Sequence, residues 1–136
     1  MTVEDIITAK HEAGHAAAAI LMGRRVKKVA VYGAHGIASG HGVMDSVPCP
    51  DETAAERLVV LVAGILYEPQ HASGDVRTVE QLRRVPGMQK ALDEATAIAR
   101  EMIATPQFRR VAWTVEKQLW GQPILYEEDV LAIVQT

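Results

Sequence analysis

Cysteine and aromatic residues are scarce in this 136-residue chain, and each scarcity excludes a class of protein. Cys49 is the single cysteine, so the chain can form neither an internal disulfide framework nor a cysteine-based zinc knuckle. Aromatic residues make up 4% of the sequence while apolar residues make up 49%, so the core must consist mainly of Ala, Val, Leu and Ile. An alanine-rich core favours closely packed helices over bulky β-sandwich layers.

Long apolar segments are also missing. The longest apolar run, residues 58–66, is far shorter than the roughly 20 residues that span a bilayer. The N-terminal stretch MTVEDIITAK is acidic and amphipathic, unlike a signal peptide. We therefore expect a soluble protein without a membrane span, and the single cysteine is compatible with the cytoplasmic location that we expect.

The chain has no strong excess of charge and no phosphate-binding loop. A net charge of −3 and a pI near 5.9 argue against a nucleic-acid binder. The one basic cluster, GRRVKK at 23–28, is expected to be a solvated helix end, because cations favour a helix C-terminus. No G-x-x-x-x-G-K-[ST] motif occurs, so the sequence provides no ATP-driven module.

Periodicity and breaker residues predict one mainly α (α+β) domain over residues 1–136. The expected helices run from Thr2 to about Met22, from Asp51 or Thr53 to Pro69, from Asp75 to about Arg84, over 91–103, after Pro106 through Trp113 and Trp120, and over 126–134. Alternating residues at 26–32 and 37–44 predict one small β-hairpin with GAHG as its turn. The two tryptophans are interpreted as core or interface anchors.

The sequence KHEAGHAAAAILMG, residues 10–23, contains the most specific motif of the chain. On a helix, His11 and His15 lie on one face, one above the other, and can direct two imidazole nitrogens at one metal ion. Glu12 lies one step round the helix, within reach of a metal-bound water whose pKa falls towards about 7. The H-E-x-x-H pattern therefore predicts a metallopeptidase site with Glu12 as general base.

The alternative interpretation is an alanine-rich core helix in which His15 is a satisfied buried histidine and His11 is exposed. Two features favour the metal site. Gly14 costs about 1 kcal/mol relative to Ala in mid-helix, which close approach of another backbone would explain. The alanines at 16–19 likewise let a neighbouring element come near.

A catalytic zinc site usually has three protein ligands and an open position, so two histidines are incomplete. Asp75 in HASGDVRT is the candidate third ligand, because it follows the expected central helix. A helix N-cap is an equally reasonable role for an aspartate in that setting.

Several segments resemble the peptidase domain of FtsH-type zinc metallopeptidases. HEAGHAAAAILMG resembles the zinc helix of that family, VKKVAVYGAHGIASG its following strand pair, and LVVLVAGILYE its central helix. VEKQLWGQPILYEEDVLAIV is similar to its closing segment. The resemblance implies a helical zincin-like fold, a bound Zn²⁺ and hydrolysis of peptide bonds in flexible or unfolded protein segments.

The resemblance also implies site residues and partners. ASGD, ending at Asp75, is similar to the family's third-ligand stretch; Asp93, Glu68 and His71 are the reserve candidates. The ATPase module and membrane segments of FtsH-type proteins are absent from this chain. The partners expected are therefore a peptide or protein substrate, a separate unfoldase and, as in that family, further copies of the chain in a homo-oligomer.

Two further features bear on peptide hydrolysis. A second polar group often polarises the scissile carbonyl in zinc peptidases, and His35, His41, Tyr67 and His71 are the candidates. The hairpin at 26–44 is expected to present an edge strand to an extended peptide. The alternative function is a non-catalytic, metal-stabilised binding or assembly module derived from the same fold, for which an intact Glu12 would be unnecessary.

Overall fold

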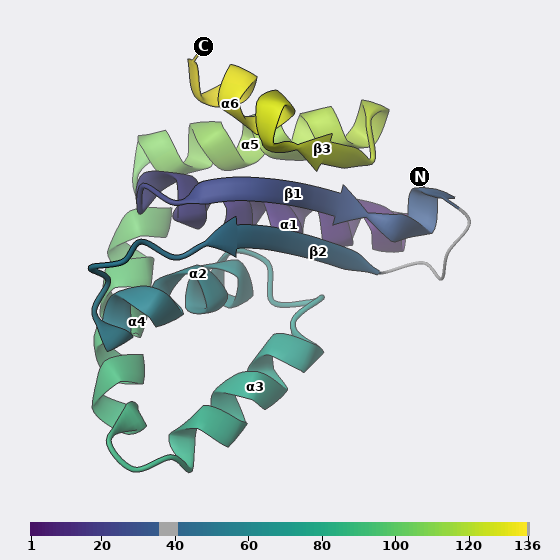
Figure 1. The fold of residues 1–136 in the computed structure, drawn as a ribbon. Helices are drawn as coiled ribbons and strands as arrows, with labels where there is room; N and C mark the ends of the chain where they lie inside the picture. Colours follow the sequence, from purple (N-terminus) through teal and green to yellow (C-terminus); the bar gives the residue numbers. More distant parts are fainter. Residues whose placement is uncertain (36–40, 136) are drawn as a thin grey trace.

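The computed structural model describes residues 1–35 and 41–135, and the expectation of a mainly helical protein is confirmed. Its elements, labelled in Figure 1, are α1 (Val3–Leu21), β1 (Arg25–Val31), the 3₁₀ helix η1 (Tyr32–His35), β2 (Gly42–Val47), α2 (Ala54–Tyr67), α3 (Ser73–Arg83), α4 (Met88–Ile103), α5 (Pro106–Gly121), β3 (Ile124–Tyr126) and α6 (Glu127–Gln135). The expected hairpin is present as β1 and β2. Its predicted residues 36–40 lie outside the described part of the chain.

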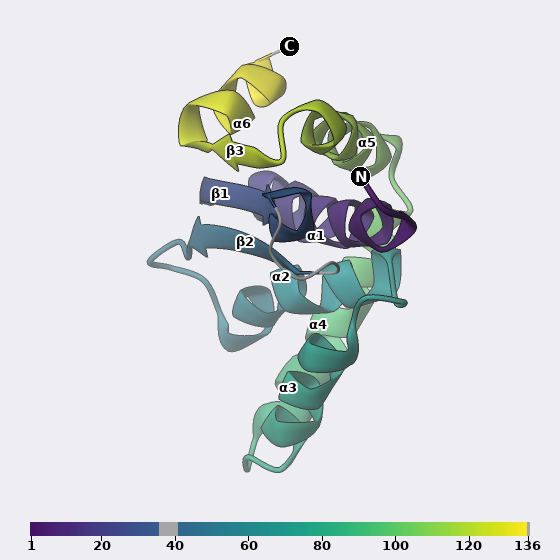
Figure 2. The same ribbon diagram turned by 90° about the vertical axis from the view of Figure 1, so that its right-hand side faces the viewer.

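Helix α1 begins and ends as the sequence predicts. The Thr2 side chain accepts a hydrogen bond from the backbone N–H of Asp5, and the Asp5 carboxylate accepts one from the backbone N–H of Thr2. These two bonds satisfy two of the unpaired donors at the helix start. Gly23, with φ of +80°, follows the helix in a left-handed conformation that terminates it. Figure 2 shows α1 in the centre of the molecule, with α5 on one side and α2 on the other.

The sheet has three antiparallel strands in the order β2-β1-β3, so it is larger than the predicted hairpin. Residues 124–126 form the third strand by pairing with residues 28–30 of β1. Strand β2 extends to Val47, three residues beyond the end of the predicted second strand at 44. Both edges of β1 are therefore paired, whereas β2 is an edge strand.

The prediction that GRRVKK, residues 23–28, forms a solvated helix end was wrong. Residues 25–28 of this cluster belong to β1, and Arg24 makes two bonds of 2.8 and 2.7 Å to the Glu52 carboxylate. Both side chains of this ion pair are buried, at 7% and 3% exposure. The pair connects the end of α1 to the loop before α2, where Thr53 and Glu56 form the N-terminal capping box of α2.

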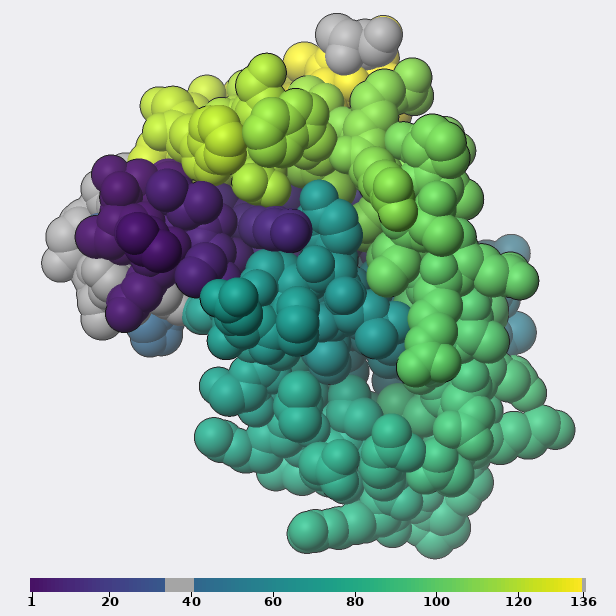
Figure 3. All heavy atoms as spheres, turned by 180° about the vertical axis from the view of Figure 1, so that it is seen from behind, coloured from purple at the N-terminus to yellow at the C-terminus, as the bar shows by residue number. Residues whose placement is uncertain are grey.

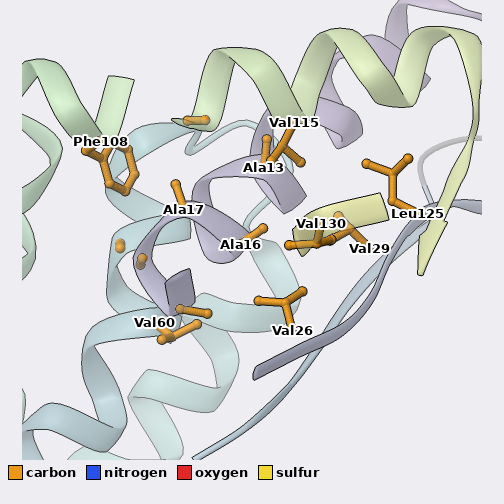
Figure 4. Packing of buried hydrophobic residues seen from close by; sticks show 14 of the residues in the cluster. Ala13, Ala16, Ala17, Val26, Val29, Val60, Phe108, Val115, Leu125 and Val130 are labelled. Carbon is orange, nitrogen blue, oxygen red and sulfur yellow. The ribbon is translucent and has the colours of Figure 1, made fainter. Parts of the chain in front are cut away.

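The core is built from small apolar side chains, as the composition predicts. Fully buried alanines of α1 pack against valines of β1 and α2 and against Phe108 and Val115 of α5 (Figure 4). Because alanine is short, the elements around α1 approach it closely on every side. The site residues of α1 are therefore enclosed between α2 and the sheet.

Helix α3 projects from this core at the lower end of the molecule (Figures 1 and 3), whereas α4 packs against α2 and contributes Ala95 and Ala99 to the core. All of α3 is described, and none of its residues is buried. Trp113 and Trp120 of α5 also lie at the surface, 49% and 44% exposed, with their rings stacked edge to face. The interpretation of the tryptophans as core anchors was wrong; a role at an interface stays a prediction.

Candidate functional site

The histidines of the H-E-x-x-H motif are both buried and both oriented by α2. The Nδ1 atom of His11 lies 2.8 Å from the carbonyl oxygen of Glu68, the C-cap residue of α2. The Nδ1 atom of His15 lies 2.7 Å from the carbonyl oxygen of Val60. A carbonyl oxygen only accepts, so each Nδ1 is the donor and each neutral ring carries its lone pair on Nε2.

The two Nε2 atoms converge with one carboxylate oxygen of Asp75. The two Nε2 atoms lie 3.0 Å from each other. The Oδ2 atom of Asp75 lies 2.7 Å from Nε2 of His11 and 2.9 Å from Nε2 of His15. With both ring protons donated to carbonyls, three electron pairs face one another. Such an arrangement is stabilised by a cation at its centre, which is either a proton or a metal ion.

The donor set fits a metal ion by its chemistry and spacing. Every separation among the three atoms is shorter than twice a Zn–N bond of about 2.0 Å, so one ion can contact all three. The motif residues His11, Glu12 and His15 form a second set, whose ligand atoms lie within 4.8 Å of one another. Of the two carboxylates, that of Asp75 is in direct contact with both imidazoles.

Gly64 of α2 allows His15 to lie against that helix. A methyl group on Gly64 would overlap the imidazole ring of His15 at Cε1 and Nδ1. Gly14 of α1 faces the Tyr67 side chain, whose Cδ2 atom would lie 2.9 Å from an added Cβ. The close approach predicted at Gly14 is thus made by a side chain, and not by a backbone.

Glu12 is buried, at 6% exposure, and borders the clefts on both sides of the histidines. Burial raises the pKa of its carboxyl group above 4.5, while the charges of His15 and His11 oppose that rise. Asp75 shows the opposite balance. Burial of Asp75 disfavours its charged form, but the bonds from His11 and His15 hold its pKa far below the usual range.

The contacts of His11 favour its positively charged form. Its burial lowers the pKa, but the Asp75 carboxylate, the Glu68 carbonyl and the charge of Glu12 outweigh burial and raise it above 6.5. The site therefore attracts positive charge although it lies at the edge of the core.

Two clefts meet at the histidines. The first, here the β2 cleft, has a volume of about 410 Å³ and runs between strand β2 and helix α2. It is lined by Glu12, His15, Arg24, residues 42–46, Arg57, Val60, Leu61 and Asp75. The second, here the His71 cleft, measures about 320 Å³ and is lined by His11, Glu12, His41, Gly42, His71, Ser73, Gly74 and Asp75.

The other sequence candidates lie in different places. His41 and His71 border the His71 cleft, and the ring of His71 lies 5.3 Å from that of His11. Tyr67 packs edge to face on Phe108. The side chain of His35 lies outside the described part of the structure.

The reserve ligands and the N-cap alternative are less well placed than Asp75. The Glu68 carboxylate accepts from the backbone N–H groups of Gln70 and His71. Asp93 is exposed on α4 and bonds to Gln89. Ala72, and not Asp75, occupies the N-cap of α3, which leaves the Asp75 side chain to the histidines.

Sequence reasoning missed three features that complete the site. The carbonyl groups of Val60 and Glu68 orient the imidazoles, and no side-chain pattern indicates a backbone acceptor. Arg57 borders the β2 cleft one helical turn before Leu61. The one available signal was Gly64, a glycine in the middle of a strongly apolar helix.

A buried H-E-x-x-H helix under a small antiparallel sheet, with a carboxylate against both imidazoles, defines the site of a metallopeptidase-class protein. Residues 2–69 match the family described as Peptidase M50B-like, and the chain belongs to this family. The match includes α1, β1, β2 and α2 but ends before Asp75. It does not support the FtsH-type assignment specifically.

No curated protein matches the chain. Among the helices in the described residues, none combines the length and the apolar character needed to cross a bilayer.

Proposed function

We propose that residues 1–136 form one peptidase-like domain that uses zinc to hydrolyse peptide bonds in flexible or unfolded protein segments. His11, His15 and Asp75 hold the metal, and Glu12 is the general base. The observation that carries this proposal is the convergence of two imidazole lone pairs and one carboxylate oxygen, all within 3.0 Å of one another. Membership of a metallopeptidase family supports the same class of reaction.

Zinc is favoured over other divalent ions by the donor types. Two imidazoles and one carboxylate are a common catalytic zinc set, with room for a fourth ligand. The second ring nitrogen of each histidine is fixed by a carbonyl, which is the outer partner that orients metal-binding imidazoles in proteins. A bound zinc lowers the pKa of water to about 7 and polarises a substrate carbonyl.

Glu12 moves the protons in this reaction. Its carboxylate accepts a proton from the attacking water and then donates it to the leaving amine. The raised pKa of Glu12 brings its proton affinity closer to that needed near neutral pH, because burial disfavours the ionised form. The helix fixes Glu12 one residue beyond His11, so base and ligand are positioned by the same turn of α1.

The substrate binds in the β2 cleft as an extended strand. In the sheet order β2-β1-β3, the outer edge of β2 pairs with no other strand among the described residues. An extended peptide can therefore bond to the backbone of residues 42–46 and pass beside His15 and Glu12. Such binding requires an unfolded segment, which favours flexible substrates or a separate unfoldase as partner.

That the protein is FtsH-like is a narrower proposal than its membership of the Peptidase M50B-like family. It rests on HEAGHAAAAILMG and on ASGD, and it adds a homo-oligomer and a cytoplasmic location to the proposed properties. The metal and the base do not depend on it.

The test measures metal content and hydrolysis together in protein purified without a histidine tag or added metal. Elemental mass spectrometry should find about one zinc per chain, lost in His15→Ala and reduced in Asp75→Asn. Cleavage of an unfolded protein should be lost in Glu12→Gln while zinc is retained. Loss of zinc from a folded Glu12→Gln protein would contradict the role of Glu12 as base.

A non-catalytic binding or assembly module is the second candidate. The open clefts beside the histidines argue against a purely structural zinc, which is closed by four protein ligands. A binding module should retain its partner equally well after Glu12→Gln and should cleave nothing.

A further inference from the structure

The β2 cleft continues past the histidines along one face of α2. Gly64 and Val60 contact His15, and Leu61 and Arg57 follow on the same face towards the start of the helix. Seven residues separate Gly64 from Arg57, which corresponds to about 10 Å along a helix axis. An extended peptide covers that length with about three residues.

Arg24 and Arg57, the two arginines at this end of the cleft, differ in whether a carboxylate neutralises them. Arg24 is neutralised by Glu52 through two short bonds. Arg57 is exposed, and within residues 1–35 and 41–135 no carboxylate forms an ion pair with its guanidinium. The backbone carbonyl oxygen of Arg57 accepts a hydrogen bond from Arg24, so the Arg24 guanidinium lies close to the backbone of Arg57.

Asp45 is the acidic residue that borders this end of the cleft. Asp45 pairs with Lys28 across the strands, and the two charges interact. Its neighbour Ser46 faces the helices, where its hydroxyl accepts from Arg24. Because successive strand side chains point to opposite faces, the Asp45 side chain points away from Arg57. The positive charge of Arg57 is therefore available to a bound peptide.

We propose that Arg57 binds a carboxylate of the substrate about three residues from the bond that is cleaved. The carboxylate is an Asp or Glu side chain, or the C-terminus of the peptide. The inference rests on the proposed function for the position of the cleaved bond and deepens it by naming the substrate class. Arg57 is a specificity residue, since it lies two helical turns from the reacting groups.

The chemistry of arginine suits this role. A guanidinium presents its N–H groups as a planar fork that binds a carboxylate through two parallel hydrogen bonds. Because Arg57 is exposed, water and salt screen the ion pair, and we expect a preference of about fivefold for Glu over Gln at that position. The preference should weaken as ionic strength rises.

The experiment selects a displayed random-peptide library on zinc-loaded Glu12→Gln protein, which binds without cleaving. Acidic residues should be enriched at one position, and adding Arg57→Gln should remove the enrichment. Adding Arg57→Glu should replace it with basic residues. Arg110→Gln is the matched control, because Arg110 is an exposed arginine on α5, on the opposite side of α1 from α2.

Synthetic peptides then separate the two sources of the carboxylate. Internal Glu and Gln versions test a side chain, and free-acid and amide ends test a C-terminus. Acidic enrichment that depends on Arg57 supports the proposal, even if the wild-type protein cleaves none of these peptides and the hydrolase function fails. Failure to enrich acidic residues, or enrichment that survives Arg57→Gln, overturns it even if the wild-type protein proves to be a peptidase.

Discussion

One glycine determines how closely His15 can approach α2, and its replacement is a test at the scale of a single residue. In Gly64→Ala the new methyl group overlaps the His15 ring, so the ring or the helix must move. We expect zinc affinity to fall by about 10–100-fold, as when an orienting partner of a ligand is lost. The free energy of unfolding should fall by about 1–3 kcal/mol because of overpacking. Zinc titration and urea unfolding measure the two effects.

Gly121→Ala is the control for this substitution. Gly121 is also helical, but a methyl group there meets no atom within 4 Å. Because alanine favours a helix over glycine by about 1 kcal/mol, this variant should keep its zinc affinity and gain slightly in stability. Equal zinc affinities for Gly64→Ala and the wild type would show that His15 does not need its contact with α2.

The site residues differ in how far a sequence can predict them. His11, Glu12 and His15 lie within about one helical turn, so local periodicity brings them together regardless of the rest of the fold. Asp75 lies 60 residues beyond His15. Only its position after the central helix and the family resemblance indicated it, because a contact at that separation depends on how α2 and α3 pack.

At the scale of elements, the Arg24–Glu52 ion pair connects the end of α1 to the loop before α2. Its contribution to the free energy of unfolding should depend on pH. The bonds from Arg24 lower the pKa of Glu52 below 4.5, against the opposing effect of burial. A lowered folded-state pKa means that the stabilisation is present above about pH 4.5 and is lost as the pH falls below that value. Glu52→Gln should lose about 2 kcal/mol of unfolding free energy at pH 7.

Urea unfolding of both proteins between pH 7 and pH 3.5 measures this dependence. The difference between wild type and Glu52→Gln should shrink below pH 4.5, since the other carboxyl groups titrate in both proteins. Glu101→Gln, an exposed position on α4, should track the wild type throughout. A difference that stays constant with pH would mean that the Glu52 charge contributes nothing to stability.

We expect helix α3 to respond most to binding of the proposed metal. It buries no residue, and Asp75 in its first turn contacts both histidines of α1. Elements with few buried contacts open most readily. Zinc should therefore slow amide hydrogen exchange in residues 73–83 by about tenfold or more, because opening α3 would remove Asp75 from the proposed metal site.

Hydrogen exchange with mass spectrometry, with and without zinc, measures this coupling. Helix α5 is the internal reference, since it does not contribute to the donor set. Asp75→Asn should abolish most of the zinc-induced protection of α3 while the α1 histidines still bind metal weakly. Unchanged protection in Asp75→Asn would assign the third ligand to another residue.

The elements that the sequence did not predict are short or depend on a neighbour. Residues 124–126 are too few for any periodicity to identify, and pairing with β1 makes them a strand. Residues 45–47 continue β2 for the same reason, although Pro48 and Pro50 follow closely. Helix caps were predicted better, because Thr2 and Thr53 act on the residues next to them.

At the scale of the whole molecule, composition determined the fold class. A chain rich in alanine and poor in aromatics packs helices closely, and the buried alanines of α1 do so against α2, α5 and the sheet. Composition does not specify which surface each helix covers. The exposed position of Trp113 and Trp120 therefore followed from the packing of α5 on α1, and aromatic content alone could not predict it.

The proposed metal should also stabilise the whole fold, because the residues proposed to hold it come from two elements that are distant in sequence. A ligand that binds only the folded state adds about 4 kcal/mol of stability at 1,000 times its Kd. For a chain of this length, that corresponds to a rise in Tm of about 10–15 °C. Differential scanning calorimetry with zinc, and again after a chelator, measures the rise and its reversal.

Variants of the site residues distinguish the role of each residue in the rise of Tm that zinc should cause. Glu12→Gln should show the full shift, since a base that is not a ligand adds nothing to metal binding. Asp75→Asn should show a smaller shift, and His15→Ala should show none. A full shift in His15→Ala would place the stabilising metal outside the H-E-x-x-H helix. The catalytic interpretation of that helix would then lose its main physical support, because Glu12 would have no bound metal beside it.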